Sequence, residues 1–183
     1  MAAGVNDDPG KVQRFREAAL PYLDDVTTLA RYLLRNAADA DDAVQECYLR
    51  ALRHFDTFRG GPIKPWLLAI LRNVCRATYV QRRDGEQTAD VSDEAAPMWT
   101  QDQETPEQSV LRRLDRDSIR GLVAALPEPF REAIVLREIN DLSYREIASV
   151  VGVPVGTVMS RLARARGLLR DAWLSAEKEG QQR

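Results

Sequence analysis

Apolar residues recur every three or four positions along most of this 183-residue chain, which is the spacing of one face of an α-helix. No stretch rich in Val, Ile and Thr alternates with polar residues, so we predict helices and no strands. The most regular stripe, predicted to lie in the core with its tryptophan included, is Ile63, Trp66, Leu67, Ile70, Leu71, Val74 and Cys75. The fold class is therefore predicted to be all-α, with two small helical domains.

Residues 1–83 are predicted to form the first domain, a bundle of four helices. Residues 12–19 make a short helix, and Pro21 fits the first turn of the next because proline has a suitable fixed φ. Asp39 or Asp41 can cap the third helix, since a carboxylate accepts hydrogen bonds from the free N–H groups at a helix start. The short loops between these helices favour antiparallel neighbours.

Residues 110–183 are predicted to form the second domain, which is also helical. One helix is predicted to end at Pro127, and Pro129 opens another that ends near Asn140. Two more helices follow, joined by a tight turn at Gly152. The modest number of apolar residues predicts a small core for this domain.

The last two predicted helices form the most informative segment of the chain. Ser143 can cap the first of them in a capping box with Glu146, and Pro154 suits the first turn of the second. The second helix has an apolar arc of Val158, Leu162, Ala165 and Leu169, and a polar arc of Thr157, Ser160, Arg161 and Arg164. One arc can pack on a neighbouring helix while the other enters a DNA major groove, as in a helix-turn-helix. The alternative is a helical hairpin with a solvated basic face.

The segment between the two domains, residues 84–109, is predicted to be a flexible acidic linker. It holds eight Asp or Glu residues, no Lys or Arg, and few large aliphatic residues, so it cannot bury enough apolar surface to fold alone. The whole chain has 26 basic and 28 acidic residues, a net charge of −2. Outside the linker the balance is 26 basic residues against 20 acidic ones, which gives +6 and leaves the helical domains able to attract phosphate.

The sequence also argues against several functional classes. No basic region followed by an apolar run marks a signal peptide, and no apolar stretch approaches the ~20 residues that span a bilayer, so a cytoplasmic protein without membrane insertion is expected. Cys47 and Cys75 suit neither a disulfide framework nor a zinc site, and both are predicted to be buried and inert. His54 has no evident nucleophile partner. We therefore expect no catalytic residues, no metal and no cofactor.

Six segments of this chain resemble the sigma-70 family of bacterial RNA polymerase sigma factors. Asp41–Glu46, Phe55–Gly60 and Trp66–Asn73 are similar to region 2 of that family, while Leu126–Glu132, Leu136–Tyr144 and Pro154–Leu162 are similar to region 4. The lack of other domains between them resembles the extracytoplasmic-function group. This resemblance implies a subunit that binds core RNA polymerase, recognises the −35 and −10 promoter elements and promotes DNA melting. It also implies an anti-sigma factor as a partner, and a linker that threads toward the active site and RNA exit path; a solvated spacer is the alternative.

The resemblance also implies roles for particular residues. Asp42, Gln45 and Glu46 match the helix that docks on the polymerase clamp, although acids at a helix start also complement the helix dipole. Asn73 matches a residue that captures an unstacked base of the −10 element, with Arg72, Arg76 and Tyr79 on or near the same exposed surface. The residues implied to contact the −35 element are Pro154, Val155, Thr157, Ser160, Arg161 and Arg164. Met159 and Ala163 differ from the arginine and aromatic residue of some relatives, which leaves the −35 sequence open.

The main alternative function is a stand-alone helix-turn-helix transcription regulator. Such a protein would bind duplex DNA tightly without polymerase, usually as a dimer on two half-sites. A sigma factor would instead co-elute with core polymerase and bind duplex DNA weakly alone. An enzyme is the third class considered, and it would need carboxylates that converge on the folded domains.

Overall fold

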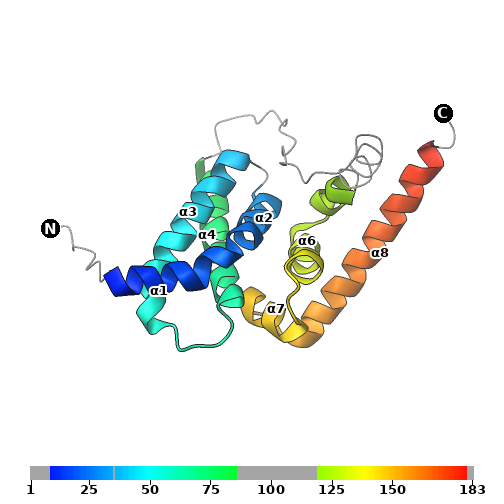
Figure 1. Ribbon diagram of the computed structural model, residues 1–183. Coiled ribbons are helices and arrows are strands. Elements are labelled where there is room, and N and C mark those ends of the chain that lie inside the picture. The colour runs from blue at the N-terminus through cyan, green and yellow to red at the C-terminus, as the bar shows by residue number, and fades with distance from the viewer. Residues whose placement is uncertain (1–8, 35, 86–118, 181–183) are drawn as a thin grey trace, which may run out of the picture.

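The computed structural model describes residues 9–34, 36–85 and 119–180, with the side chains of 79–85 and 177–180 excepted. These residues form helices and turns and contain no strand, as predicted. The first half comprises α1 (Pro9–Ala19), the 3₁₀ turn η1 (Leu20–Tyr22), α2 (Leu23–Leu33), α3 (Ala37–His54), the 3₁₀ turn η2 (Phe55–Thr57) and α4 (Ile63–Gly85). The second half comprises a helical segment at 119–125, α6 (Glu128–Ile134), the π-helical turn η4 (Val135–Ile139), α7 (Tyr144–Val151) and α8 (Val155–Gly180). Figure 1 shows α1 to α4 on one side of the molecule and α6 to α8 on the other.

The core of the first half is built around α4, whose apolar stripe faces α2 and α3. Leu67, Leu68 and Leu71 are fully buried there, and Cys47 of α3 is buried opposite them. Trp66 is only partly buried, and its ring lies against Phe58 with 4.9 Å between the centroids. The predicted stripe is therefore the inner face of α4, and the predicted bundle is present.

The start of α3 differs from the prediction that Asp39 or Asp41 caps it. The N-cap is Asn36, whose side-chain oxygen accepts a hydrogen bond of 3.2 Å from the backbone N–H of Asp39. Helix α3 therefore begins at Ala37, and both aspartates lie inside it. The physical reason is that asparagine caps as well as aspartate does, and the two alanines after Asn36 extend the helix toward it.

The helix-turn-helix segment folds as predicted. Ser143 and Glu146 form a capping box at the start of α7, and Gly152 ends that helix with a φ of 71°, a left-handed conformation that glycine adopts without strain. Pro154 lies just before α8, and its carbonyl accepts hydrogen bonds from the N–H groups of Thr157 and Val158. On α8, Val158, Leu162 and Ala165 are buried against α6 and α7.

The helix predicted to begin at Pro129 starts one residue earlier and ends in an irregular turn. Helix α6 gives way to η4, in which the N–H of Asn140 donates to the carbonyl of Val135. Such π-turns insert one extra residue and rotate the following chain. The turn brings Asn140 to a fully buried position between the two halves.

The two halves pack directly against each other, with α4 against α7 and α2 against α6. The buried residues of both halves form one continuous core cluster. The predicted linker begins within α4, which continues to Gly85, and residues 86–109 lie outside the described part of the chain. The two predicted domains therefore share an interface, and that interface determines which faces of α4 and α6 are accessible.

Candidate nucleic-acid and protein interfaces

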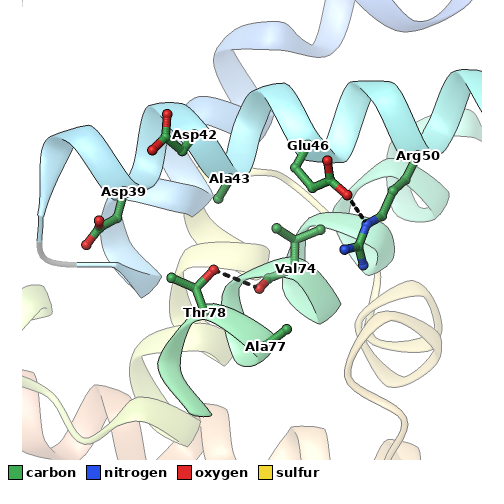
Figure 2. A pocket seen from close by; sticks show the side chains of 8 residues that line it. All are labelled: Asp39, Asp42, Ala43, Glu46, Arg50, Val74, Ala77 and Thr78. Carbon is green, nitrogen blue, oxygen red and sulfur yellow. Dashed lines mark hydrogen bonds and ion pairs between the residues drawn. The ribbon is translucent and has the colours of Figure 1, made fainter. Parts of the chain in front are cut away.

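An acidic groove of about 270 Å³ runs between α3 and α4 (Figure 2). It is lined by Asp39, Asp42, Ala43, Glu46, Arg50, Val74, Ala77 and Thr78. Glu46 accepts a hydrogen bond of 2.6 Å from Arg50, and Asp42 forms no ion pair with the described residues. With three carboxylates against one guanidinium, the groove carries a net negative charge, which favours a basic partner surface.

Two of the three residues predicted to dock on a protein, Asp42 and Glu46, line this groove, and Gln45 precedes Glu46 on α3. Asp42 and Gln45 are exposed and Glu46 is partly exposed, because the opposite side of α3 is buried through Ala43 and Cys47. Leu49 lies one turn beyond Gln45 and is 50% exposed. Leu49 was not among the predicted residues, although a leucine outside the apolar stripe of its helix was a usable signal. An apolar residue beside charged ones is typical of a protein interface.

The predicted nucleic-acid surface on α4 is only partly accessible. Asn73 and Arg76 are exposed, and neither has a hydrogen-bond or ion-pair partner among the described residues. The side chain of Tyr79 lies outside the described residues. Arg72 is partly buried, and its Nε donates to Oε1 of Glu132 on α6, at 2.5 Å. The prediction of an exposed Arg72 is therefore wrong in this conformation, because the second half of the chain covers that side of α4.

The polar arc of α8 is open to solvent, as predicted from its spacing. Ser160 and Arg164 are exposed and Thr157 and Arg161 are partly exposed, while Ser160 Oγ donates to the carbonyl of Thr157 at 2.9 Å. Neither arginine forms an ion pair with a described residue, so both guanidinium groups are available to an anionic partner. Pro154, Val155 and Met159 are also exposed, Met159 by 55%. This arc combines free cations, hydroxyl groups and apolar atoms, which are the groups that contact phosphates and base edges.

Arg166 lies outside that arc and is already paired. Its Nη2 donates to Oε1 of Glu138 at 2.7 Å, and this hydrogen bond to Glu138 raises the pKa of the guanidinium. Both side chains are about half exposed, so the pair is a surface ion pair of modest strength. Arg166 is thus less available to an external anion than Arg161 or Arg164.

The two cysteines are buried, as predicted. Burial raises the pKa of both Cys47 and Cys75 to about 12, so both thiols are protonated near neutral pH. Since the thiolate is the reactive form, these side chains behave as inert core residues. Among the described residues, no three His, Cys, Asp or Glu side chains gather closely enough to hold a metal ion. No single described helix could span a membrane; the bent pair of Tyr144–Val151 and Val155–Ala176 qualifies by length and composition only.

Comparison with known proteins associates each half of the chain with a described region. Residues 19–85 match the model of sigma-70 region 2, and residues 116–169 match that of sigma-70 region 4. The chain is 39% identical to the ECF RNA polymerase sigma factor EcfG of Rhodopseudomonas palustris, covering 83% of this chain and 79% of that one. It is 34% identical to the RNA polymerase sigma-H factor of Pseudomonas aeruginosa, covering 86% and 84% of the two chains. Among solved structures, the sigma factor RpoE in complex with the anti-sigma factor NepR from Bartonella quintana has a TM-score of 0.74 at 26% identity, covering 87% of this chain and 96% of that one.

Proposed function

The chain belongs to the sigma-70 family, in its extracytoplasmic-function group, and we propose that its two halves divide the work of promoter recognition. It is an RNA polymerase sigma factor, a class that directs core polymerase to promoters and is not a family of catalytic enzymes. In the division proposed, the second half reads the −35 element, while the first half binds core polymerase and captures the melted −10 element. The expected location of the chain is the cytoplasm, because bacterial RNA polymerase acts in that compartment.

The observation that carries this proposal is the exposed arc of α8. Arg161 and Arg164 have no ion-pair partner among the described residues, and they stand beside the hydroxyl groups of Thr157 and Ser160. The opposite arc, with Val158, is buried against the rest of the domain and fixes the orientation of the helix. A helix held in this way presents side chains that can form hydrogen bonds to base edges in the major groove. Pro154 and Val155 would lie near the DNA backbone or the methyl groups of thymine bases.

The proposed −10 contact is the exposed face of α4. Asn73 carries an amide with both donor and acceptor groups, which suits the edge of an unstacked base. Arg76 lies close by on the same helix and would bind the strand backbone, with Arg72 and Tyr79 as further proposed contacts. The lack of any intramolecular hydrogen bond to Asn73 among the described residues supports a role toward an external ligand.

The proposed polymerase contact is the acidic groove lined by Asp42 and Glu46, together with the exposed Gln45 of the same helix. A basic and partly apolar surface of core polymerase would complement these carboxylates and the exposed Leu49. An anti-sigma factor is proposed as a further partner, because a structural relative is in complex with one. That partner would compete for surfaces that polymerase needs.

In vitro transcription tests this proposal directly. Core RNA polymerase is incubated with fragments of the source genome, with and without the full chain, and the RNA ends are mapped. A sigma factor is expected to yield new transcripts from a small set of start sites that share upstream sequences. Tight binding of the chain alone to duplex DNA as a dimer, without new transcripts, would instead support the stand-alone regulator.

A further inference from the structure

A largely buried charge pair between the two halves joins α4, the proposed −10 helix, to α6. Arg72 Nε and Glu132 Oε1 are 2.5 Å apart, and the two side chains are only 13% and 5% exposed. The residues are 60 positions apart in the sequence. The pair thus depends on the packing of the two halves and on nothing local. A buried charge pair of this kind is stable only while both partners stay in place.

A second polar contact lies between the same halves. The side-chain amide of Asn140 donates to the backbone carbonyl of Asp25 at 3.1 Å and to its carboxylate at 3.3 Å. That carboxylate is also 2.9 Å from the ammonium group of Lys64. The side-chain oxygen of Asn140 accepts no hydrogen bond from the described residues, although it is buried. We call the Arg72–Glu132 pair together with the Asn140–Asp25 hydrogen bonds the interdomain latch.

The latch differs from an ordinary domain core in its physical character. It contains a charge pair and a buried acceptor left without a donor, both of which make the closed state less favourable than an apolar contact would be. Figure 1 shows α6 and α7 standing beside the four helices of the first half, with α7 near the start of α4. An interface with such polar groups resembles those that allow two domains to separate.

We propose that Glu132 takes the place of a DNA phosphate on Arg72, so that the closed chain blocks its own −10 surface. This inference rests on the proposed function of α4. A carboxylate and a phosphate present similar oxygen pairs to a guanidinium, so Arg72 can bind one or the other but not both. When the two halves separate, Arg72 loses Glu132 and becomes accessible to promoter DNA beside Asn73 and Arg76. Because only open chains can make this contact, the apparent affinity for −10 DNA equals the affinity of the open chain multiplied by the fraction of chains that are open.

The substitution Glu132→Gln tests this inference, because it keeps the shape of the side chain and removes the charge. It leaves Arg72 buried without a counter-charge in the closed state, which is strongly unfavourable, so the halves are expected to separate. The matched control is Glu138→Gln, which makes the same change in the surface pair with Arg166 within the second half. Circular dichroism melting of each variant reports whether the helices still fold.

The distance between the halves is measured by fluorescence energy transfer in the full chain. Dyes are attached to cysteines introduced at Arg16 and Ser175, which are exposed, whereas Cys47 and Cys75 are buried and poorly reactive. Binding is measured in parallel on single-stranded DNA that carries the −10 element of a promoter found by the transcription experiment. E132Q is expected to lower the energy transfer and to raise the affinity for this DNA about tenfold or more, which corresponds to about 1.4 kcal/mol. E138Q is expected to change neither.

A second variant separates opening from DNA contact. Arg72→Gln also breaks the pair, so it should lower the energy transfer as E132Q does, but it should not gain DNA affinity, because the contact itself is lost. The exchange of both residues, R72E with E132R, is expected to restore closure and to bind DNA less well than the unmodified chain.

Unchanged energy transfer in E132Q would overturn the latch. Opening without a gain in DNA affinity would overturn the competition between Glu132 and DNA. If the unmodified chain gives no transcripts with core polymerase, the proposed function fails, and the distance measurement still decides whether the latch exists.

Discussion

Replacement of Arg164 by alanine is the most direct test of how α8 is oriented on DNA. The side chain is exposed and forms no ion pair with the described residues, so its removal breaks nothing in the folded chain. The substitution should therefore lower the affinity for promoter DNA and leave the free energy of unfolding unchanged. A guanidinium that reads a guanine edge contributes about 1–3 kcal/mol, so the affinity should fall about 5- to 150-fold at promoters with the preferred base.

The control for this experiment is Arg166→Ala on the same helix. Arg166 is held by Glu138, and release from a surface ion pair costs up to about 1 kcal/mol before the guanidinium can reach DNA. Its removal should therefore weaken promoter binding less than the removal of Arg164 does.

The assay measures binding of the reconstituted holoenzyme to promoters that differ at single −35 positions, over a range of salt concentrations. A base contact by Arg164 predicts relaxed selectivity at one position. A phosphate contact predicts equal weakening of all promoters and a salt slope smaller by about 1. If R164A binds every promoter as well as the unmodified chain does, or if R166A has the larger effect, the orientation assigned to α8 is wrong.

Three further predictions concern the other surfaces. Reversal of the charge at both Asp42 and Glu46 should weaken binding to core polymerase by a few kcal/mol at most, and unchanged competition with another sigma factor would remove both residues from the interface. Asn73→Ala should leave core binding intact but impair melting of the start-site bubble, as seen by permanganate footprinting, while the melting temperature stays unchanged because this side chain has no hydrogen bond to a described residue. Ser143→Ala should lower the free energy of unfolding by about 1 kcal/mol through loss of the cap. Hydrogen bonds from Ser143 lower the pKa of Glu146, so this stabilisation should be present above the ordinary glutamate pKa and be lost as the pH falls through the lowered value, which urea unfolding at several pH values can follow.

The features that sequence analysis predicted well depend on residues within one or two helical turns of each other. The stripe that includes Leu71 and Val74 is buried because residues three and four apart share one face of a helix. The capping box of Ser143 and the left-handed turn at Gly152 follow from single residue types at fixed spacing. The arc of α8 that carries Arg164 follows from the same periodicity. In each case the interaction is local, so the sequence contains all the information needed.

The features that were missed depend on competition or on distant residues. The predicted start of α3 was wrong because Asn36, Asp39 and Asp41 can each cap a helix. The local sequence does not determine which of the three does so. The irregular turn η4 leaves no pattern in the sequence, because an inserted residue shifts the helical register without a change in composition. Asn140 was therefore predicted only as a helix end, whereas it is buried between the two halves.

Arg72 shows why a role cannot be assigned to this surface from helix position alone. The sequence places it in a basic cluster next to Asn73, and that cluster predicts attraction to phosphate. The fold supplies Glu132 from 60 residues away, and this carboxylate satisfies the same guanidinium that DNA would need. The two arginines therefore differ in their availability to DNA. Arg164 on α8 can bind DNA in the closed chain, whereas Arg72 on α4 must first lose its buried partner Glu132. If both proposals hold, contact with the −35 element is possible before the halves separate, and the −10 contact of Arg72 is possible only afterwards.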